Sequence, residues 1–277
     1  MLPPDLPPIK NKVLYAYRVF AKWFSFFYFG INVVVLVSVI FPITRLILHP
    51  RERFKKFCRG LISSAMRLFV FVMHVVGASS LEKVDRNSYR NIRSKIIVAN
   101  HPSLLDVIML LSLIPNADCI VAGYTEHGIL REIVRQLYIL SSHNFDDILQ
   151  ACSESLKQGN CLIIFPEGTR TPRSGKIIIK KGAARIALTS GCNILPLHIG
   201  GTDKYGLGKR DPWTGYNPRE RYLYRISMGE EISPEKYQGL SKPVAARALT
   251  KEIAGILFPD HADSGQTNPE EEIIEEA

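Results

Sequence analysis

From residue 95 onward, two hydrophobic patterns alternate along the chain. Short runs rich in β-branched and other apolar residues predict strands, and longer amphipathic stretches predict helices. The strands are expected over 95–99, 119–122, 137–140, 161–165, 194–199 and 222–228, and the helices over 104–113, 129–135, 145–157, 181–190 and 242–257. This alternation predicts an α/β fold in which a mixed sheet is flanked by helices.

The first part of the chain has a different pattern, with long apolar stretches and basic flanks. The 22 residues between Lys22 and Arg45 carry no charge, which is enough helix to cross a hydrocarbon core about 30 Å thick. A second apolar stretch, 61–76, contains Arg67 and His74 and is therefore amphipathic. Basic segments stand before the first stretch and between the two, so a helical hairpin in one anionic leaflet and a single transmembrane crossing both fit.

These patterns divide the chain into three parts. Residues 1–80 are expected to form membrane-anchoring helices joined by a basic linker at 51–59, and residues 81–260 the α/β domain. The tail 261–277 is acidic and is expected to be disordered. The whole chain carries a formal charge of +9, and the basic front of the chain favours an anionic partner such as a lipid surface.

One candidate site lies where the strand at 95–99 ends and the next helix begins. The segment reads Asn100-His101-Pro102-Ser103-Leu104-Leu105-Asp106. Five residues apart on one helix, His101 and Asp106 would point about 140° away from each other, so they can meet only if His101 precedes the helix. Pro102, expected in the first helical turn, favours that break. A carboxylate at Nδ1 would fix the imidazole tautomer and leave Nε2 as a general base, whereas a structural histidine is the competing interpretation.

A second candidate site follows the strand at 161–165. Its motif is Pro166-Glu167-Gly168-Thr169-Arg170, followed by a basic loop and a helix that begins near Lys181. Glycine permits close approach of a ligand, Arg170 can bind two phosphate oxygens, and Thr169 can donate a hydroxyl. A solvated loop is the alternative. Without an aromatic platform, a helix-turn-helix or a zinc pattern, the basic residues do not predict a nucleic-acid partner.

Together the two motifs resemble the glycerolipid acyltransferase family, typified by the lysophosphatidic acid (1-acyl-glycerol-3-phosphate) acyltransferases. The order and spacing of the Asn-His-x4-Asp motif, the Phe-Pro-Glu-Gly-Thr-Arg motif, Lys181-Gly182-Ala183 and Leu195-Pro196-Leu197 carry this resemblance, which covers about 96–201. It implies that His101 is the base and Asp106 its orienting partner. It also implies that the acceptor lies against Glu167, Gly168, Thr169, Arg170, Lys181 and Pro196.

One position departs from the family pattern. After the expected strand 137–140, where the family has an arginine that contacts the acceptor phosphate, this chain has Ser141-Ser142. Arg131 or Arg135 could replace that arginine. The departure therefore favours either a rearranged phosphate site or a different acceptor, because serine cannot reproduce a bidentate arginine contact.

The sequence thus predicts a membrane-bound O-acyltransferase that moves a fatty acyl group to a lysophospholipid hydroxyl. Acyl-CoA or acyl carrier protein would be the donor, membrane lipids the partners, and no cofactor or metal is expected. There is no Gly-x-Ser-x-Gly motif, so direct attack by the acceptor is favoured over an acyl-enzyme. The alternatives are a non-phosphate acceptor such as a lyso-ornithine lipid, an inert membrane adaptor, and a lysolipid hydrolase. The expected location is the bacterial inner membrane, with the catalytic domain on the cytoplasmic side.

Overall fold

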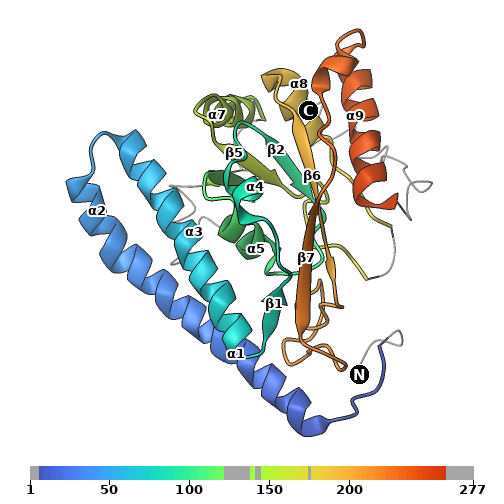
Figure 1. Ribbon diagram of the computed structural model, residues 1–277. Coiled ribbons are helices and arrows are strands. Elements are labelled where there is room, and N and C mark those ends of the chain that lie inside the picture. The colour runs from blue at the N-terminus through green and yellow to red at the C-terminus, as the bar shows by residue number, and fades with distance from the viewer. Residues whose placement is uncertain (1–5, 122–137, 141–144, 174–175, 260–277) are drawn as a thin grey trace.

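The computed structural model describes residues 6–121, 138–140, 145–173 and 176–259, and the fold is reported for these residues. A seven-stranded sheet forms its centre, in the order β1-β7-β6-β2-β5-β3-β4 (Figure 1). The strands are β1 (Ser79–Leu81), β2 (Ile96–Ala99), β3 (Ala117–Val121), β4 (Tyr138–Leu140), β5 (Cys161–Ile164), β6 (Ile194–Gly201) and β7 (Tyr222–Met228). All neighbouring strands are parallel except β6 and β7, which are antiparallel. The expected mixed sheet flanked by helices is confirmed.

Two groups of helices cover the two faces of this sheet. One face packs against α1 (Lys12–Val35), α3 (Arg51–Val75) and α5 (Asp106–Leu113) in a single hydrophobic core. The other face packs against α7 (Phe145–Lys157), α8 (Gly182–Ser190) and α9 (Lys242–Leu257). Both faces of the central strands are therefore buried, which explains why β2 and β5 consist entirely of apolar residues.

The N-terminal helices form a long hairpin along one side of the molecule (Figure 1). Asn11 begins α1, its side-chain oxygen accepting from the backbone N–H of Leu14 at 2.9 Å. The helix continues through a π-helical stretch, Leu36–Ile40, into α2 (Phe41–Ile47), and α3 then returns along it. Pro42, which has no N–H to donate, is the second residue after the π-helical stretch. By length and composition, the helices over Lys12–Ile47 and Glu52–Val75 could each cross a membrane.

The structure corrects two expectations for this region. Residues 51–59 are not a linker, because they form the first turns of α3. Arg59 binds Asp118 of β3 through two hydrogen bonds of 2.6 and 3.0 Å, so it attaches the hairpin to the sheet. Lys22, which precedes the uncharged run, is not an exposed cation, because its side chain is fully buried against the β6–β7 loop. The expected domain boundary after residue 80 falls within β1.

The remaining elements follow the sequence pattern closely. The expected bounds of α7, α9 and β7 are those observed, and β6 extends two residues further than expected. The pattern did not predict β1, α4 (Arg86–Arg90) or the 3₁₀ helix Pro234–Tyr237. The expected helix at 129–135, Ser141-Ser142 and the acidic tail 261–277 lie outside the described residues.

Candidate active site

The first motif lies at the carboxyl end of β2, in the turn that leads into α5. Because α5 begins at Asp106, His101 stands before the helix and can reach its first residue. His101 Nδ1 lies 2.8 Å from Asp106 Oδ2. A carboxylate accepts hydrogen bonds, so Nδ1 carries the proton and Nε2, on the far side of the ring, can accept one. The expected contact is therefore present. Pro102, which was expected in the first helical turn, instead lies in the segment before the helix.

Asp106 is fully buried and held by further donors. The backbone N–H of Ser103 donates to Oδ2 at 2.7 Å, and the Ser103 hydroxyl donates to Oδ1 at 2.5 Å. Tyr224 of β7 lies behind this serine, with its hydroxyl 2.8 Å from Ser103 Oγ. Burial raises the pKa of Tyr224 well above its usual value, so its hydroxyl stays a donor. The carboxylate that faces His101 is thus fixed in position from three directions.

Sequence reasoning missed Ser103 and Tyr224. The position of Ser103, three residues before an acidic residue at a helix start, was an available signal. Tyr224 gave no such signal, because its contact joins residues 121 positions apart.

The second motif folds over the first. Phe165, which follows β5, stacks on the His101 ring with centroids 4.1 Å apart and planes 23° apart. Glu167 Oε1 accepts from the backbone N–H of His101 at 2.9 Å and from the Thr171 hydroxyl at 2.8 Å. Thr171 in turn donates its backbone N–H to the His101 carbonyl at 2.7 Å. Since β2 and β5 are adjacent and parallel, their carboxyl ends meet, and this brings the two motifs together.

Glu167 is almost completely buried, and its two carboxylate oxygens differ. Oε1 has the two donors described above, whereas the buried Oε2 has no hydrogen-bond partner among the described residues. Burial raises the pKa of Glu167, and the hydrogen bonds from Thr171 and His101 oppose that shift. A carboxylate with one unpaired buried oxygen can accept a hydrogen bond from a ligand hydroxyl.

The three residues that follow Glu167 in this motif differ in their surroundings. Gly168 has φ +64°, a left-handed conformation that favours glycine, and the flexible side chain of Lys180 lies over it. Arg170 Nη1 donates to the carbonyls of Leu207 and Gly208, at 3.0 and 2.9 Å. Thr169 is exposed, and the hydroxyl that joins the site is that of Thr171.

Two further expected site residues belong to other elements. Pro196 pairs with Val98 in the sheet register, three residues before His101. It belongs with Ile194 and Val98 to the sheet face that packs against α9. Lys181 directly precedes α8. The structure therefore brings together His101, Asp106 and Glu167. Arg170 contacts the β6–β7 loop, and Pro196 lies on the sheet face toward α9.

Two buried polar residues strengthen this edge of the sheet. The Asn100 side chain donates to the Ile199 carbonyl at 2.9 Å and accepts from its N–H at 2.7 Å, which continues the β2–β6 ladder beyond the strand. Lys204 Nζ lies 4.5 Å from the centre of the Tyr224 ring and donates to the Leu223 carbonyl at 2.8 Å. Burial lowers the pKa of Lys204 to about 8, against the opposing effect of nearby carboxylates, with Asp106 first among them.

This geometry can hold one protonated ring nitrogen against a buried carboxylate and present the other to a proton donor. The backbone of His101 is held by Glu167 and Thr171, and its ring by Asp106 and Phe165. Such a histidine can accept a proton from a hydroxyl without reorganisation.

Comparisons with known proteins show which family this chain resembles. Residues 80–200 match the family model described as Acyltransferase. A 1-acyl-sn-glycerol-3-phosphate acyltransferase of Cocos nucifera is 30% identical over 129 residues, 43% of this chain and 41% of that protein. One of the same name from Helicobacter pylori is 30% identical over 158 residues, 54% of this chain and 66% of that protein. The chain spans about half the length, or less, of the plant relatives that it matches.

A solved structure has the same fold. The crystal structure of the 1-acyl-sn-glycerophosphate (LPA) acyltransferase from Thermotoga maritima matches with a TM-score of 0.63 and 20% identity. The match covers 91% of this chain and 99% of that one, and thus includes the N-terminal hairpin. Residues 80–200 therefore form a domain of the acyltransferase family, and the resemblance to the glycerolipid acyltransferases that the two motifs predicted is confirmed.

Proposed function

We propose that this protein is a membrane-associated acyltransferase that moves a fatty acyl group from a thioester to the hydroxyl of a lysophospholipid resembling lysophosphatidic acid. The observation that carries the proposal is the 2.8 Å contact between His101 Nδ1 and the buried carboxylate of Asp106, in a domain of the acyltransferase family. The names of the relatives support a glycerol-phosphate acceptor.

In the proposed reaction, His101 acts as a general base. Nε2 takes the proton of the acceptor hydroxyl while that oxygen attacks the thioester carbonyl. The tetrahedral intermediate then collapses, the carbon–sulfur bond breaks, and the proton passes from His101 to the leaving thiolate. Asp106 stabilises the imidazolium during this cycle, as in other histidine–carboxylate pairs.

The acceptor is proposed to lie against the second motif. The unpaired Oε2 of Glu167 would accept a hydroxyl of the glycerol. Arg170 and the exposed Lys180, whose stem covers Gly168, would attract the phosphate. Because Arg170 Nη1 already holds the 207–208 carbonyls, the remainder of its guanidinium would face the ligand.

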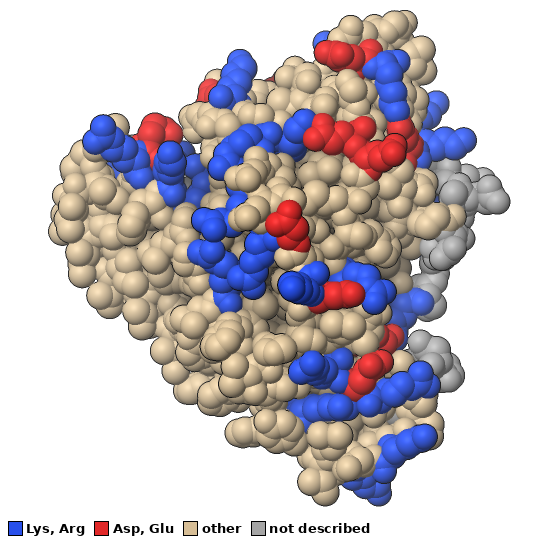
Figure 2. All heavy atoms as spheres, viewed as in Figure 1, with Lys and Arg blue, Asp and Glu red and all other residues tan. Residues whose placement is uncertain are grey.

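The proposed location is a membrane surface, with the hairpin as the anchor. Exposed apolar side chains cover the outer side of the hairpin (Figure 2). Exposed basic residues stand at both ends of the hairpin, Lys10 and Lys12 at one and Arg53 and Lys56 at the other. Two basic ends favour a hairpin embedded in one anionic leaflet over a crossing. We place the protein at the bacterial inner membrane, with its catalytic domain on the cytoplasmic side. Acyl-CoA or acyl carrier protein would be its donor there.

The test uses the purified full chain on vesicles of phosphatidylcholine and phosphatidylglycerol. Labelled acyl-CoA and, separately, labelled acyl carrier protein are offered with lysophosphatidic acid, lysophosphatidylcholine or lyso-ornithine lipid. We expect the label in phosphatidic acid. Label found chiefly in acylated ornithine lipid would support the alternative acceptor, and label released only as free fatty acid would indicate a hydrolase. No product with any acceptor would contradict the proposal.

A further inference from the structure

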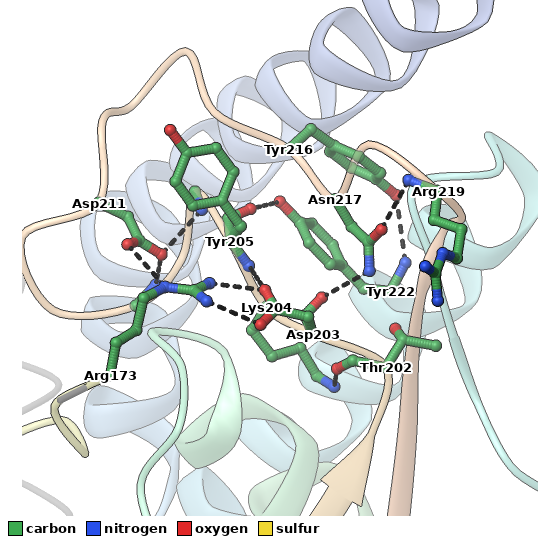
Figure 3. A network of polar contacts seen from close by, with 12 residues as sticks. Arg173, Thr202, Asp203, Lys204, Tyr205, Asp211, Tyr216, Asn217, Arg219 and Tyr222 are labelled. Atoms are coloured by element: carbon green, nitrogen blue, oxygen red, sulfur yellow. Dashed lines mark hydrogen bonds and ion pairs between the residues drawn. The ribbon is translucent and has the colours of Figure 1, made fainter. Parts of the chain in front are cut away.

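The β6–β7 loop, residues 202–221, is folded tightly and lies beside α1 (Figure 3). Asp211 Oδ2 accepts from the backbone N–H groups of Gly206 and Gly208, at 2.9 and 3.0 Å. Arg173 forms ion pairs with Asp203 at 2.6 Å and with Asp211 at 3.3 Å. Since side chains bind the loop backbone at several points, the loop holds one shape.

Lys22 attaches the far end of this loop to α1. Its side chain is fully buried, and Nζ donates to the carbonyls of Trp213 and Gly215, both at 2.6 Å, and to that of Gly206 at 3.4 Å. A buried ammonium requires such partners, because desolvation without them is costly. Trp213 therefore has a fixed position relative to α1.

The Trp213 side chain extends the apolar surface of α1. Its ring lies 6.0 Å from that of Trp23 and 6.4 Å from that of Phe26. It is nevertheless 57% exposed, and Trp23 is 45% exposed. Phe20 and Phe27, three and four residues from Trp23, are 65% and 69% exposed and lie on the same side of the helix. Lys22, in contrast, points toward the loop.

The charges of this loop are mainly basic. It carries Lys209, Arg210, Arg219 and Arg221, of which the three arginines are exposed, and one exposed acidic residue, Glu220. The acidic residue nearest to Trp213 in sequence, Asp211, is occupied by Arg173 and the loop backbone. An exposed tryptophan beside cations is typical of the headgroup region of a bilayer.

From these observations we infer that the β6–β7 loop is a second membrane contact, in which Trp213 enters the interfacial region beside Trp23. The inference rests on the proposed membrane association of the hairpin and adds a contact from the catalytic domain.

The chain has two tryptophans, which permits a direct test. W23F leaves Trp213 as the single fluorophore, and W213F leaves Trp23. Each protein is bound to phosphatidylcholine–phosphatidylglycerol vesicles, with and without lipids brominated on the upper acyl chain, and accessibility to aqueous acrylamide is measured. We expect vesicles to shift the emission of Trp213 to shorter wavelength. Brominated lipid should quench Trp213 about as strongly as Trp23.

A third protein, W23F/W213F/L240W, carries its only tryptophan at exposed Leu240, beyond the opposite face of the sheet, and should stay accessible to acrylamide. If Trp23 is quenched by brominated lipid while Trp213 remains as accessible as the tryptophan at 240, the inference is wrong and the hairpin anchor stands. If neither Trp23 nor Trp213 is quenched, the proposed membrane association fails as well. The readout does not depend on turnover, so it separates both results from a failure of the proposed reaction.

Discussion

The carboxyl edge of the sheet and the outer side of the hairpin differ in which side chains are buried and which are exposed. At the sheet edge, polar groups are buried and bound, as Asp106 is by Ser103 and His101. On the hairpin, apolar groups such as Phe20 and Phe27 are exposed, and the fully exposed charged groups lie toward the ends. In water the first arrangement fixes reactive groups in place, whereas the second is unfavourable unless another apolar phase covers it.

The same difference separates the helices on the two sides of the sheet. The outer surface of α7 is polar, with Asp146, Asp147, Gln150, Glu154 and Lys157 exposed. The hairpin keeps an apolar outer surface, which Figure 2 shows as a continuous tan area between basic ends. One side of the molecule thus presents polar groups to water, and the other presents the apolar surface that the proposed membrane contact would cover.

The largest expected effect is that of His101→Ala on turnover. A positioned general base contributes about 10²- to 10⁴-fold, so the rate should fall by that factor while vesicle binding stays unchanged. His74→Ala, a change at an exposed histidine of α3, is the matched control and should keep wild-type turnover. A His101→Ala protein with more than about a tenth of the wild-type rate would exclude the base assignment.

The next effect separates the hairpin from the site. Burying a phenylalanine is worth about 1.5–3 kcal/mol, so Phe20→Glu/Phe27→Glu should weaken vesicle binding by about 100-fold or more. A co-flotation assay measures this. Leu240→Glu/Val244→Glu, at exposed positions on the other side of the sheet, should leave binding unchanged. Substitution is preferable to removing residues 1–59, because α1 and α3 share a core with the sheet.

Lys22→Met tests whether the attachment between the hairpin and the β6–β7 loop is structural. Three buried carbonyls would lose their charged donor, and the free energy of unfolding should fall by about 2–4 kcal/mol. Lys56→Met, the same change at an exposed position of α3, should cost less than about 0.5 kcal/mol. Equal unfolding curves for the two variants would contradict the assigned role of Lys22.

The smallest expected effect concerns Glu167. Because burial raises its pKa in the folded state, its contribution to stability is fully present at low pH and is lost as the pH rises through that pKa. Glu167→Gln keeps an acceptor oxygen and has no charge, so its stability relative to wild type should increase from pH 4 to pH 8 in urea titrations. Glu230→Gln, at an exposed glutamate, should show no such trend. A relative stability of Glu167→Gln that is independent of pH would refute the argument.

The sequence predicted the parts of this molecule whose contacts are local or periodic. The strand Tyr222–Met228 alternates buried and exposed positions, and α7 has a clear amphipathic period. The contact between His101 and Asp106 followed from their spacing and the intervening proline.

The features that the sequence could not predict depend on contacts between residues far apart in the chain. In the sequence, Lys22 is a basic residue before the uncharged run, and only its contacts with the carbonyls of a loop about 190 residues away show that it is buried. The basic run at 51–59 reads as a linker, yet Arg59 pairs with Asp118 of β3. The β6–β7 loop has no hydrophobic period, because side chains such as Asp211 bind its backbone in place of a ladder.

The most direct test compares the two roles assigned here, catalysis at the sheet edge and vesicle binding by the hairpin. It measures turnover per vesicle-bound molecule in the wild type, His101→Ala and Phe20→Glu/Phe27→Glu on the same vesicles, with lysophosphatidic acid and labelled acyl-CoA. We predict that His101→Ala binds as the wild type does and that its turnover is slower by about 100-fold or a larger factor. The hairpin variant should bind poorly and keep the wild-type rate per bound molecule. Wild-type turnover by bound His101→Ala, or unchanged binding by the hairpin variant, would contradict the account.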